Sequence, residues 1–376
     1  MSSGRTFRKI HSRAPTRIDL AGGTVDIWPI YLFLNQPTTI NLGIDLYAEA
    51  ELVENDTGHV LLRSGDQGTE LKLEWHELDQ AKVSPMLELH LKYLLFFLAR
   101  KKNANLFDPA HGLTLTTSAK SPAGAGLGGS STLSIAMIGA LATWASRDIQ
   151  ESRSIDPMVV GERLIEVARD VETTVIQVPA GLQDYYGAMF GGVQSLRWLP
   201  AIHDRKWLAN ETMADDLMQG LEKRLILFYS GQSRNSGINN WALFKSFMDR
   251  QGSVREHFQA IADATCKLEK ALKARDWVGI GEAIQEEWQV RRHLASGIST
   301  PEMDQAFALA LNEGATAGKI CGAGGGGCFF VYLPTDDAAL RARIQDKIIS
   351  SEFARTGGIR ALPFQASRKG LDIRIA

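Results

Sequence analysis

The sequence predicts an α+β protein with two domains. Segments in which apolar and polar side chains alternate, as in half-buried strands, occur alongside longer segments with apolar residues at helical spacing. The chain has 376 residues, and because one domain commonly holds about 150 residues, two domains with large cores are expected. The polar, irregular segment 200–211 is the expected boundary, which gives domains of residues 1–205 and 206–376.

Strands are expected at 38–53 and 60–75, on either side of the turn residues Asn55-Asp-Thr-Gly58. A short alternating strand also precedes the Gly22-Gly23 turn. The remaining segments with strand character are 113–117, 193–198, 225–229 and 329–332.

Helices are expected where start signals precede an apolar periodicity. Ser84-Pro85 places a hydroxyl cap and a first-turn proline before a helix that runs to Lys102, and lysines at its end suit the helix dipole. Asp156-Pro157 opens a helix to about Thr174, and Ser299-Thr-Pro301 opens another. Two further segments are expected to be helical. One is 133–142, whose side chains are small and apolar, and the other is an amphipathic stretch that ends at Leu294.

The charge balance excludes two classes of main partner. Lys and Arg total 41 against 43 Asp and Glu, so neither a nucleic acid nor a membrane surface is expected. No run of about 18 apolar residues and no apolar signal region occurs. Three cysteines without metal-ligand spacing indicate neither a disulfide framework nor a zinc site. We therefore expect a soluble, cytoplasmic protein, and a homodimer is compatible with a sequence that leaves the oligomeric state open.

A glycine-rich loop lies between the strand 113–117 and the helix 133–142. Glycines let the backbone approach a ligand and adopt positive φ, and the N-terminus of a helix attracts anions. A triphosphate fits that description. The residues expected to bind it are Pro122, Gly124, Ala125, Gly126, Leu127, Gly128, Gly129, Ser130 and Ser131.

Three other interpretations of this loop compete. It is a plain tight turn in which Ser130 or Ser131 caps a helix, or a dinucleotide site, because Gly124-x-Gly126-x-x-Gly129 with Asp148 fits that fingerprint. The Ser-Ser pair instead favours a metal-phosphate site, since a hydroxyl at a helix start ligates Mg²⁺ in P-loop enzymes. No Gly-x-x-x-x-Gly-Lys-Ser/Thr motif occurs, which excludes an ordinary P-loop.

Charged residues elsewhere allow two readings each. Glu172 is near the C-terminal end of its helix, where the dipole opposes a carboxylate, so it is either a metal ligand or a solvated side chain. Asp184 leads into a short apolar segment and is either a cap or a general base. Arg17, Asp19 and Asp26 surround the Gly22-Gly23 turn and are either a solvated strand edge or the sign of a close backbone approach.

A second glycine loop precedes the strand 329–332. Its core, Gly324 to Gly327, is four consecutive glycines, which are costly in chain entropy, so a plain turn explains them poorly.

Three ordered motifs resemble those of the GHMP kinases, the family of galactokinase, homoserine kinase, mevalonate kinase and phosphomevalonate kinase. They are Ala14-Pro-Thr-Arg-Ile-Asp-Leu-Ala-Gly-Gly-Thr-Val-Asp26, Pro122-Ala-Gly-Ala-Gly-Leu-Gly-Gly-Ser-Ser131 and Gly322-Ala-Gly-Gly-Gly-Gly327. The resemblance implies an N-terminal domain with a left-handed βαβ crossover, a ferredoxin-like C-terminal domain and an active site between them. Within the family, the chain looks most like the kinases of D-glycero-D-manno-heptose 7-phosphate, which phosphorylate the anomeric hydroxyl. The segments that carry this resemblance are the Gly22-Gly23 turn, Leu182-Gln-Asp184 followed by Gly191-Gly192, Leu227-Phe-Tyr-Ser-Gly231 with Arg234, and Ala323-Gly-Gly-Gly-Gly327.

The resemblance also implies roles in ATP-dependent phosphoryl transfer to a sugar or sugar phosphate. Ser130 and Glu172 would hold Mg²⁺, Gly124 to Gly129 would cradle ATP, Asp184 would act on the acceptor hydroxyl and Arg17 would stabilise charge. The residues expected at the acceptor are Asp26, Gly22, Gly23, Arg234, Gly324 and Gly325.

The acceptor is the least determined part of this prediction. Thr24-Val25-Asp26 departs from the Gly-Thr-Asp or Trp-Ser/Thr-Asp usual in such sugar kinases. A phosphorylated acceptor needs a second anion site, for which Arg234 and Lys319 are candidates. For Lys319, a surface charge is the favoured interpretation. A neutral hexose such as galactose or fucose is the alternative acceptor, and a nicotinamide-dependent dehydrogenase is the alternative from another class.

Overall fold

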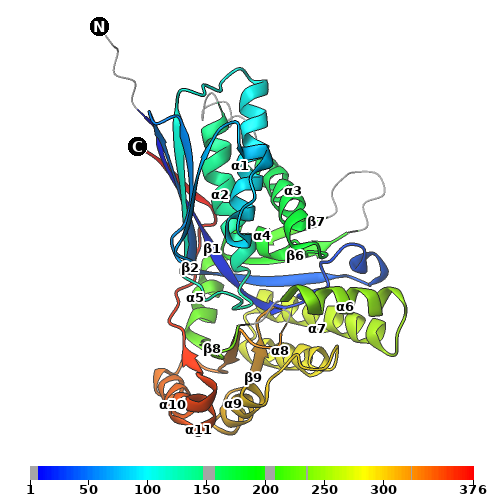
Figure 1. The fold of residues 1–376 in the computed structure, drawn as a ribbon. Coiled ribbons are helices and arrows are strands. Elements are labelled where there is room, and N and C mark those ends of the chain that lie inside the picture. Colours follow the sequence, from blue (N-terminus) through cyan, green and yellow to red (C-terminus); the bar gives the residue numbers. More distant parts are fainter. Residues whose placement is uncertain (1–6, 147–156, 200–207, 234–235, 323) are drawn as a thin grey trace.

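Two β-sheets with helices packed on them make up the molecule, one above the other in Figure 1. The computed structural model describes residues 7–146, 157–199, 208–233, 236–322 and 324–376. None of the helices in these ranges is long and apolar enough to cross a membrane.

The large sheet has eight strands in the described part of the chain. Its main path runs β12-β1-β2-β5-β3-β4, and the β6–β7 hairpin adds to β2. The strands are β1 (Lys9–Ala21), β2 (Thr38–Asn55), β3 (His59–Ser64), β4 (Thr69–Glu74), β5 (Gly112–Ala119), β6 (Val193–Trp198), β7 (Leu208–Thr212) and β12 (Asp372–Ile375). The parallel pair β3 and β5 is joined through β4 and α1, which makes a crossover connection.

Helices cover one face of this sheet (Figure 1). They are α1 (Pro85–Asn103), α2 (Gly129–Ala145), α3 (Pro157–Ile176) and α4 (Gln183–Phe190), and the short 3-10 helices are η1 (Ile30–Phe33) and η2 (Leu78–Gln80). Because the residues of α2 are mostly small or apolar, this helix packs directly on β1 and β2. Its residues from Ile135 to Leu141 are buried.

The small sheet is antiparallel, with the order β11-β8-β10-β9. Its strands are β8 (Leu225–Tyr229), β9 (Ala317–Ile320), β10 (Cys328–Tyr332) and β11 (Arg360–Ala361). The helices of this half are α5 (Asp215–Arg224), α6 (Ser236–Met248), α7 (Val254–Ala274), α8 (Trp277–Arg291), α9 (Pro301–Asn312), α10 (Ala338–Ser350) and α11 (Glu352–Gly357). Helices lie between β8 and β9 and between β10 and β11, so this is the ferredoxin-like arrangement. The predicted two-domain α+β fold is confirmed.

Two expectations about elements were wrong. Residues 60–75 form two strands rather than one, because Gly68 takes a positive φ of 62° and the chain turns back there. Residues 208–211 are not irregular, since β7 pairs with β6.

The expected domain boundary at residue 205 falls in the segment 200–207, outside the described residues, and stays a prediction. Two elements beyond it, β7 and β12, belong to the large sheet.

A shared hydrophobic core joins the two sheets. Ile18 and Leu20 of β1 belong to the same buried cluster as Leu227 of β8 and Ile284 of α8. Because β1 and β8 belong to different sheets, loops from both halves meet beside this cluster. The predicted motifs lie in those loops.

Candidate active site

The loop from Pro122 to Gly129 connects β5 to α2 and has the geometry of an anion cradle. Gly124, Gly126 and Gly128 take φ values of 66°, 72° and 74°, in the left-handed region that favours glycine. Between them the side chains of Ala125 and Leu127 are buried and anchor the loop. The loop therefore directs backbone outward at the N-terminus of α2, where the helix dipole favours anions.

Both halves of the molecule hold this loop in place. The Arg17 amide of β1 donates to the Leu127 carbonyl at 3.2 Å, and the Cys328 amide of β10 donates to the Ala125 carbonyl at 2.7 Å. A Cβ at Gly126 would overlap the carbonyl of Cys321. The first and second glycine loops thus pack directly on each other, with the described Gly324 and Gly325 at positive φ of 81°.

The structure decides against two interpretations of the first loop. Gly128 is the N-cap of α2 and no side chain caps that helix, so neither Ser130 nor Ser131 is the cap. Among the described strands, β6 follows α2 but pairs antiparallel with β2 rather than parallel with β5, so no dinucleotide-binding βαβ unit forms here. Asp148 lies outside the described residues.

Glu172 is buried, and the expectation of a solvated side chain is wrong. Its Oε2 accepts hydrogen bonds from the Ser134 hydroxyl at 3.1 Å and the Tyr185 hydroxyl at 2.8 Å. Burial raises the pKa of Glu172, and the hydroxyls of Ser130, Tyr185 and Ser134 oppose that rise. The side chain points from α3 toward the exposed Ser130 in the first turn of α2.

Asp184 lies on α4, directly against the first loop. A Cβ at Gly128 would come within 3.0 Å of its carboxyl carbon. The buried Arg17 donates to Asp184 Oδ1 through Nε at 2.8 Å and to the Gly126 carbonyl through Nη1 at 2.8 Å. One guanidinium therefore ties the carboxylate to the loop, and a quarter of the Asp184 side chain, 26%, stays exposed.

Asp26 lies beside Asp184 but in a drier environment. Its Oδ2 accepts the Gln183 amide at 2.9 Å, and its Oδ1 has no hydrogen-bond partner among the described residues. Burial raises the pKa of Asp26 to about 7. A buried, unpartnered carboxyl oxygen is costly unless a ligand satisfies it.

The Gly22-Gly23 turn is held by a buried ionic network. Lys319 is fully buried, and its Nζ is 3.0 Å from Asp19 Oδ2 and 3.8 Å from Glu287 Oε1. Arg291 donates to Glu287 and, at 2.7 Å, to the Gly23 carbonyl. The interpretation of Asp19 as part of a solvated edge and of Lys319 as a surface charge is wrong, and the pairing of Lys319 also removes it as a cation for the acceptor. Arg234 lies outside the described residues.

Glu172 and Ser130 fit a magnesium ion bound together with nucleotide phosphates. Glu172 is buried with hydroxyl partners and without a salt bridge in the described part of the chain, an environment that a cation would compensate. Mg²⁺ commonly takes one or two protein oxygens, with phosphates and waters completing its shell. No three His, Cys, Asp or Glu residues cluster as metal ligands in the described ranges, so the nucleotide would supply the remaining ligands.

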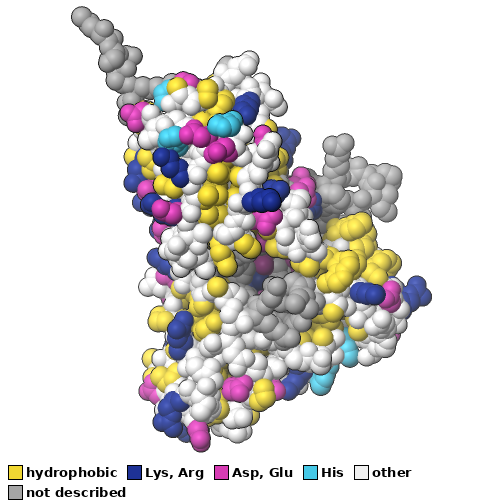
Figure 2. All heavy atoms as spheres, viewed as in Figure 1, with side chains coloured by type: hydrophobic (Ala, Val, Ile, Leu, Met, Phe, Trp, Pro, Cys, Tyr) yellow, Lys and Arg dark blue, Asp and Glu magenta, His cyan; other side chains and the backbone are white. Residues whose placement is uncertain are grey.

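A cavity of about 520 Å³ has Asp26 in its lining, whereas none of residues 122–129 of the first loop, all described, lines it. Of the residues that the structure describes, two charged ones line it, Asp26 and Arg169. Its other walls are largely aromatic or apolar: Trp28, Tyr31, Thr173, Pro179, Ala180, Leu182, Tyr186, Trp198, Trp241 and Phe244. Hydrophobic side chains gather over η1 and α6 (Figure 2). Trp28 and Trp241, which line the cavity, are 64% and 50% exposed.

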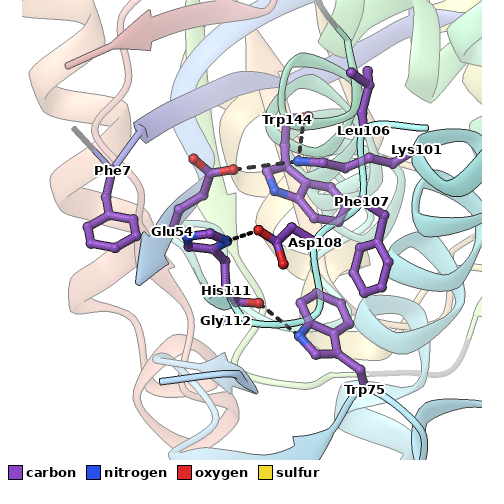
Figure 3. Close-up of a pocket in the computed structure, with 10 residues that line it drawn as sticks. All are labelled: Phe7, Glu54, Trp75, Lys101, Leu106, Phe107, Asp108, His111, Gly112 and Trp144. Carbon is purple, nitrogen blue, oxygen red and sulfur yellow. Dashed lines mark hydrogen bonds and ion pairs between the residues drawn. The ribbon is translucent and has the colours of Figure 1, made fainter. Parts of the chain in front are cut away.

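A second hollow is too small for a substrate. It measures about 30 Å³ and lies at the start of β5, away from the glycine loop that follows the end of that strand. Figure 3 shows its polar lining already paired, with Lys101 bonded to the Trp144 carbonyl and His111 to Asp108. We assign it no ligand.

The sequence analysis missed several residues around the site. Ser134 and Tyr185 donate to Glu172, the Gln183 amide donates to Asp26, and Arg291 of α8 donates to the Gly23 carbonyl. The spacing of Ser130 and Ser134, one helical turn, was the one available clue to a shared face of α2.

Two family models match this chain. The model described as the GHMP kinases N terminal domain matches residues 92–192, and that described as GHMP kinases C terminal matches residues 268–350. They cover the first glycine loop, Glu172 and Asp184 in one case and the second glycine loop in the other.

Curated relatives point the same way. The D-glycero-alpha-D-manno-heptose 7-phosphate kinase of Campylobacter jejuni is 24% identical over 87% of this chain and 90% of its own. The L-fucokinase/L-fucose-1-P guanylyltransferase of Bacteroides fragilis is 25% identical over 97% of this chain, which spans 38% of that protein's length.

Solved structures agree with the fold. A D-glycero-D-manno-heptose 1-phosphate kinase from Bacteroides thetaiotaomicron is 20% identical, with a TM-score of 0.70, over 97% of this chain and 98% of its own. The galactokinase of Lactococcus lactis, complexed with galactose, is 15% identical, with a TM-score of 0.69, over 97% and 95%. At these identities the likeness establishes the fold alone.

Proposed function

Because this chain belongs to the GHMP kinase family and is a phosphotransferase with a hydroxyl acceptor, we propose that it transfers the γ-phosphoryl group of Mg·ATP to a sugar. The acceptor we favour is D-glycero-D-manno-heptose 7-phosphate, at its anomeric hydroxyl. The observation that carries this proposal is the position of Asp184, which packs on the first glycine loop on one side and adjoins Asp26 on the other.

The first loop and the N-terminus of α2 would bind the triphosphate through backbone amides. Phosphoryl transfer depends chiefly on alignment and on stabilising charge, and a rigid loop buried at Ala125 and Leu127 suits both. Glu172 and Ser130 would hold Mg²⁺, which, when bound, neutralises charge on the phosphates.

Asp184 would orient the acceptor hydroxyl and take its proton. Arg17 bonds to Oδ1 in the described structure, which leaves Oδ2 for the hydroxyl. The same guanidinium carries positive charge at the edge of the phosphate loop, where it would also stabilise the transferring phosphoryl group. The unpartnered Oδ1 of Asp26 would accept a second hydroxyl of the sugar.

A phosphorus NMR assay of the purified protein with Mg·ATP and a panel of sugars and sugar phosphates tests the proposal. Heptose 7-phosphate should give a new anomeric phosphate signal. Efficient use of galactose or fucose with heptose 7-phosphate inert would favour the neutral-sugar alternative, which the fucokinase relative supports.

We also propose a cytoplasmic location, consistent with a reaction that consumes ATP. The homodimer stays a prediction, for which light scattering of the purified protein is the direct test.

A further inference from the structure

The cavity beside Asp26 has an unusual distribution of charge. In the described part of the chain, six aromatic side chains line it, and its charged groups there are the carboxyl of Asp26 and the guanidinium of Arg169. An apolar wall strengthens any ionic contact made inside it, because the local dielectric constant is low. The two charged residues should therefore dominate the selection of what binds there.

Arg169 reaches the cavity from α3, one helical turn before Thr173, which also lines it. Glu172 lies on the same helix but its carboxylate turns toward Ser134 and Tyr185. One face of α3 thus serves the proposed metal site, and the adjacent face serves the cavity. The charge of Arg169 is close enough to Tyr31 to lower the pKa of this phenol, against the larger effect of burial, which raises it.

Asp170, which pairs with Arg169, would compete only weakly with a ligand for the Arg169 guanidinium. Its guanidinium bonds to Asp170 Oδ1 at 2.6 and 2.8 Å, but Asp170 is its sequence neighbour and is 66% exposed. Exposed ion pairs of this kind contribute little, because water screens them. An anion in the drier cavity would compete effectively for the same guanidinium.

We propose that Arg169 binds an anionic substituent, a phosphate or a carboxylate, on the acceptor, and so selects phosphorylated or acidic sugars over neutral ones. This inference rests on the proposed kinase function and names the acceptor class. Arginine suits the role because its planar fork binds phosphate and carboxylate through two parallel hydrogen bonds. The aromatic walls would contact the apolar faces of the sugar ring.

Steady-state kinetics with a matched pair of acceptors tests this inference. The pair is D-glycero-D-manno-heptose 7-phosphate and the same heptose without phosphate, each with saturating Mg·ATP. For Arg169→Gln we expect the KM of the phosphorylated acceptor to rise about 10- to 100-fold, because the variant loses a charge-assisted hydrogen bond to the phosphate. The KM of the neutral heptose, the KM of ATP and kcat should change little.

Two variants separate recognition from structure. Arg169→Lys keeps the charge but loses the fork, so it should restore part of the affinity for the phosphorylated acceptor. Arg163→Gln removes an exposed arginine from the same helix and should leave both acceptors unaffected. An equal loss on both acceptors in Arg169→Gln, or no loss on either, would overturn the assignment, as would a wild-type preference for the neutral heptose.

The experiments distinguish a failure of the kinase proposal from a failure of the assignment of Arg169 as an anion-binding residue. If the wild type transfers phosphate to no sugar, the kinase proposal fails, and calorimetric titration with heptose 7-phosphate still tests the cavity. Binding that is weakened in Arg169→Gln but not in Arg163→Gln would support the anion site. Equal binding by the wild type and both variants, or binding by none, would contradict it.

Discussion

The carboxylates of Asp184 and Glu172 flank the same glycine loop but have different partners. Asp184 is paired with the buried Arg17 and stays partly exposed, at a position open to an acceptor. Glu172 has hydroxyl partners and a pKa raised by burial, so its charged form lacks a compensating cation. The two environments match the two roles we propose, a base for Asp184 and a metal ligand for Glu172.

Replacing Asp184 by Asn should lower kcat by about 10²- to 10⁴-fold, because the amide cannot accept the acceptor proton. The affinity for ATP should be nearly unchanged, since Asp184 faces the acceptor side of the loop. Single-turnover kinetics combined with nucleotide titration separates the two effects. Near-normal turnover would remove Asp184 from the mechanism.

Replacing Glu172 by Gln should weaken the response to Mg²⁺. We expect the magnesium concentration for half-maximal rate to rise, with a loss of transition-state stabilisation of about 3 kcal/mol or less. Glu166→Gln is the matched control, because Glu166 is an exposed carboxylate on the same helix. A magnesium titration that coincides for both variants and the wild type would contradict the metal assignment.

The sequence predicted that some of the candidate residues meet, but not how each is held. Arg17, Gly128 and Asp184 lie in contact, as expected. Their motifs are far apart in the sequence, but the chemistry of each motif could be recognised from its own residues. The burial of Glu172 and Lys319 was missed. Their partners, Tyr185 for one and Asp19 for the other, come from other elements, and no local pattern shows such pairing.

Elements with local signals were predicted best. Pro85 begins α1, and the Thr300 hydroxyl caps α9 by accepting the Met303 amide at 3.3 Å, because caps and first-turn prolines act within one helical turn. The return of β12 to β1 was not predicted. Pairing between strands hundreds of residues apart depends on the whole fold and leaves no local trace.

The packing of α1 on β5 leads to a prediction about pH. His90 of α1 is buried, and its Nε2 lies 2.7 Å from the Thr117 hydroxyl of β5. Burial lowers the pKa of His90 to about 4, below the value of about 6.5 in an unfolded chain. The unfolded chain therefore binds a proton that the folded protein does not, and stability is lost as pH falls from about 6.5 toward 4.

The free energy of unfolding of the wild type should fall by about 3 kcal/mol or less from this residue over that range. His90→Gln should flatten this part of the pH profile, because glutamine does not titrate. Urea unfolding at several pH values measures the effect, with His293→Gln as the exposed control. Parallel profiles for the wild type and His90→Gln would show that His90 does not contribute.

At the scale of the whole molecule, a buried ionic network connects the two halves. Asp19 belongs to β1 of the large sheet, Lys319 to β9 of the small sheet, and Glu287 and Arg291 to α8. Burial alone would raise the pKa of Asp19, but Lys319, Arg291 and Arg17 together hold it below its usual value. The network also hydrogen-bonds to the Gly22-Gly23 turn. The relative position of the halves and the shape of this turn therefore depend on the same charges.

Lys319→Met should therefore destabilise the whole protein. The substitution keeps the apolar stem but leaves the carboxylates of Asp19 and Glu287 buried with less compensating charge, and breaking a buried pair in this way commonly costs about 3 to 5 kcal/mol. Lys347→Met is the control, because Lys347 makes a salt bridge to Glu313 on the surface, where both partners are accessible, and such a pair contributes about 1 kcal/mol or less. Urea unfolding of both variants measures the difference, and a double variant, Lys319→Met with Asp19→Asn, should recover part of the loss because it removes one uncompensated charge. A Lys319→Met protein as stable as Lys347→Met would mean that packing, rather than this network, holds the two halves together.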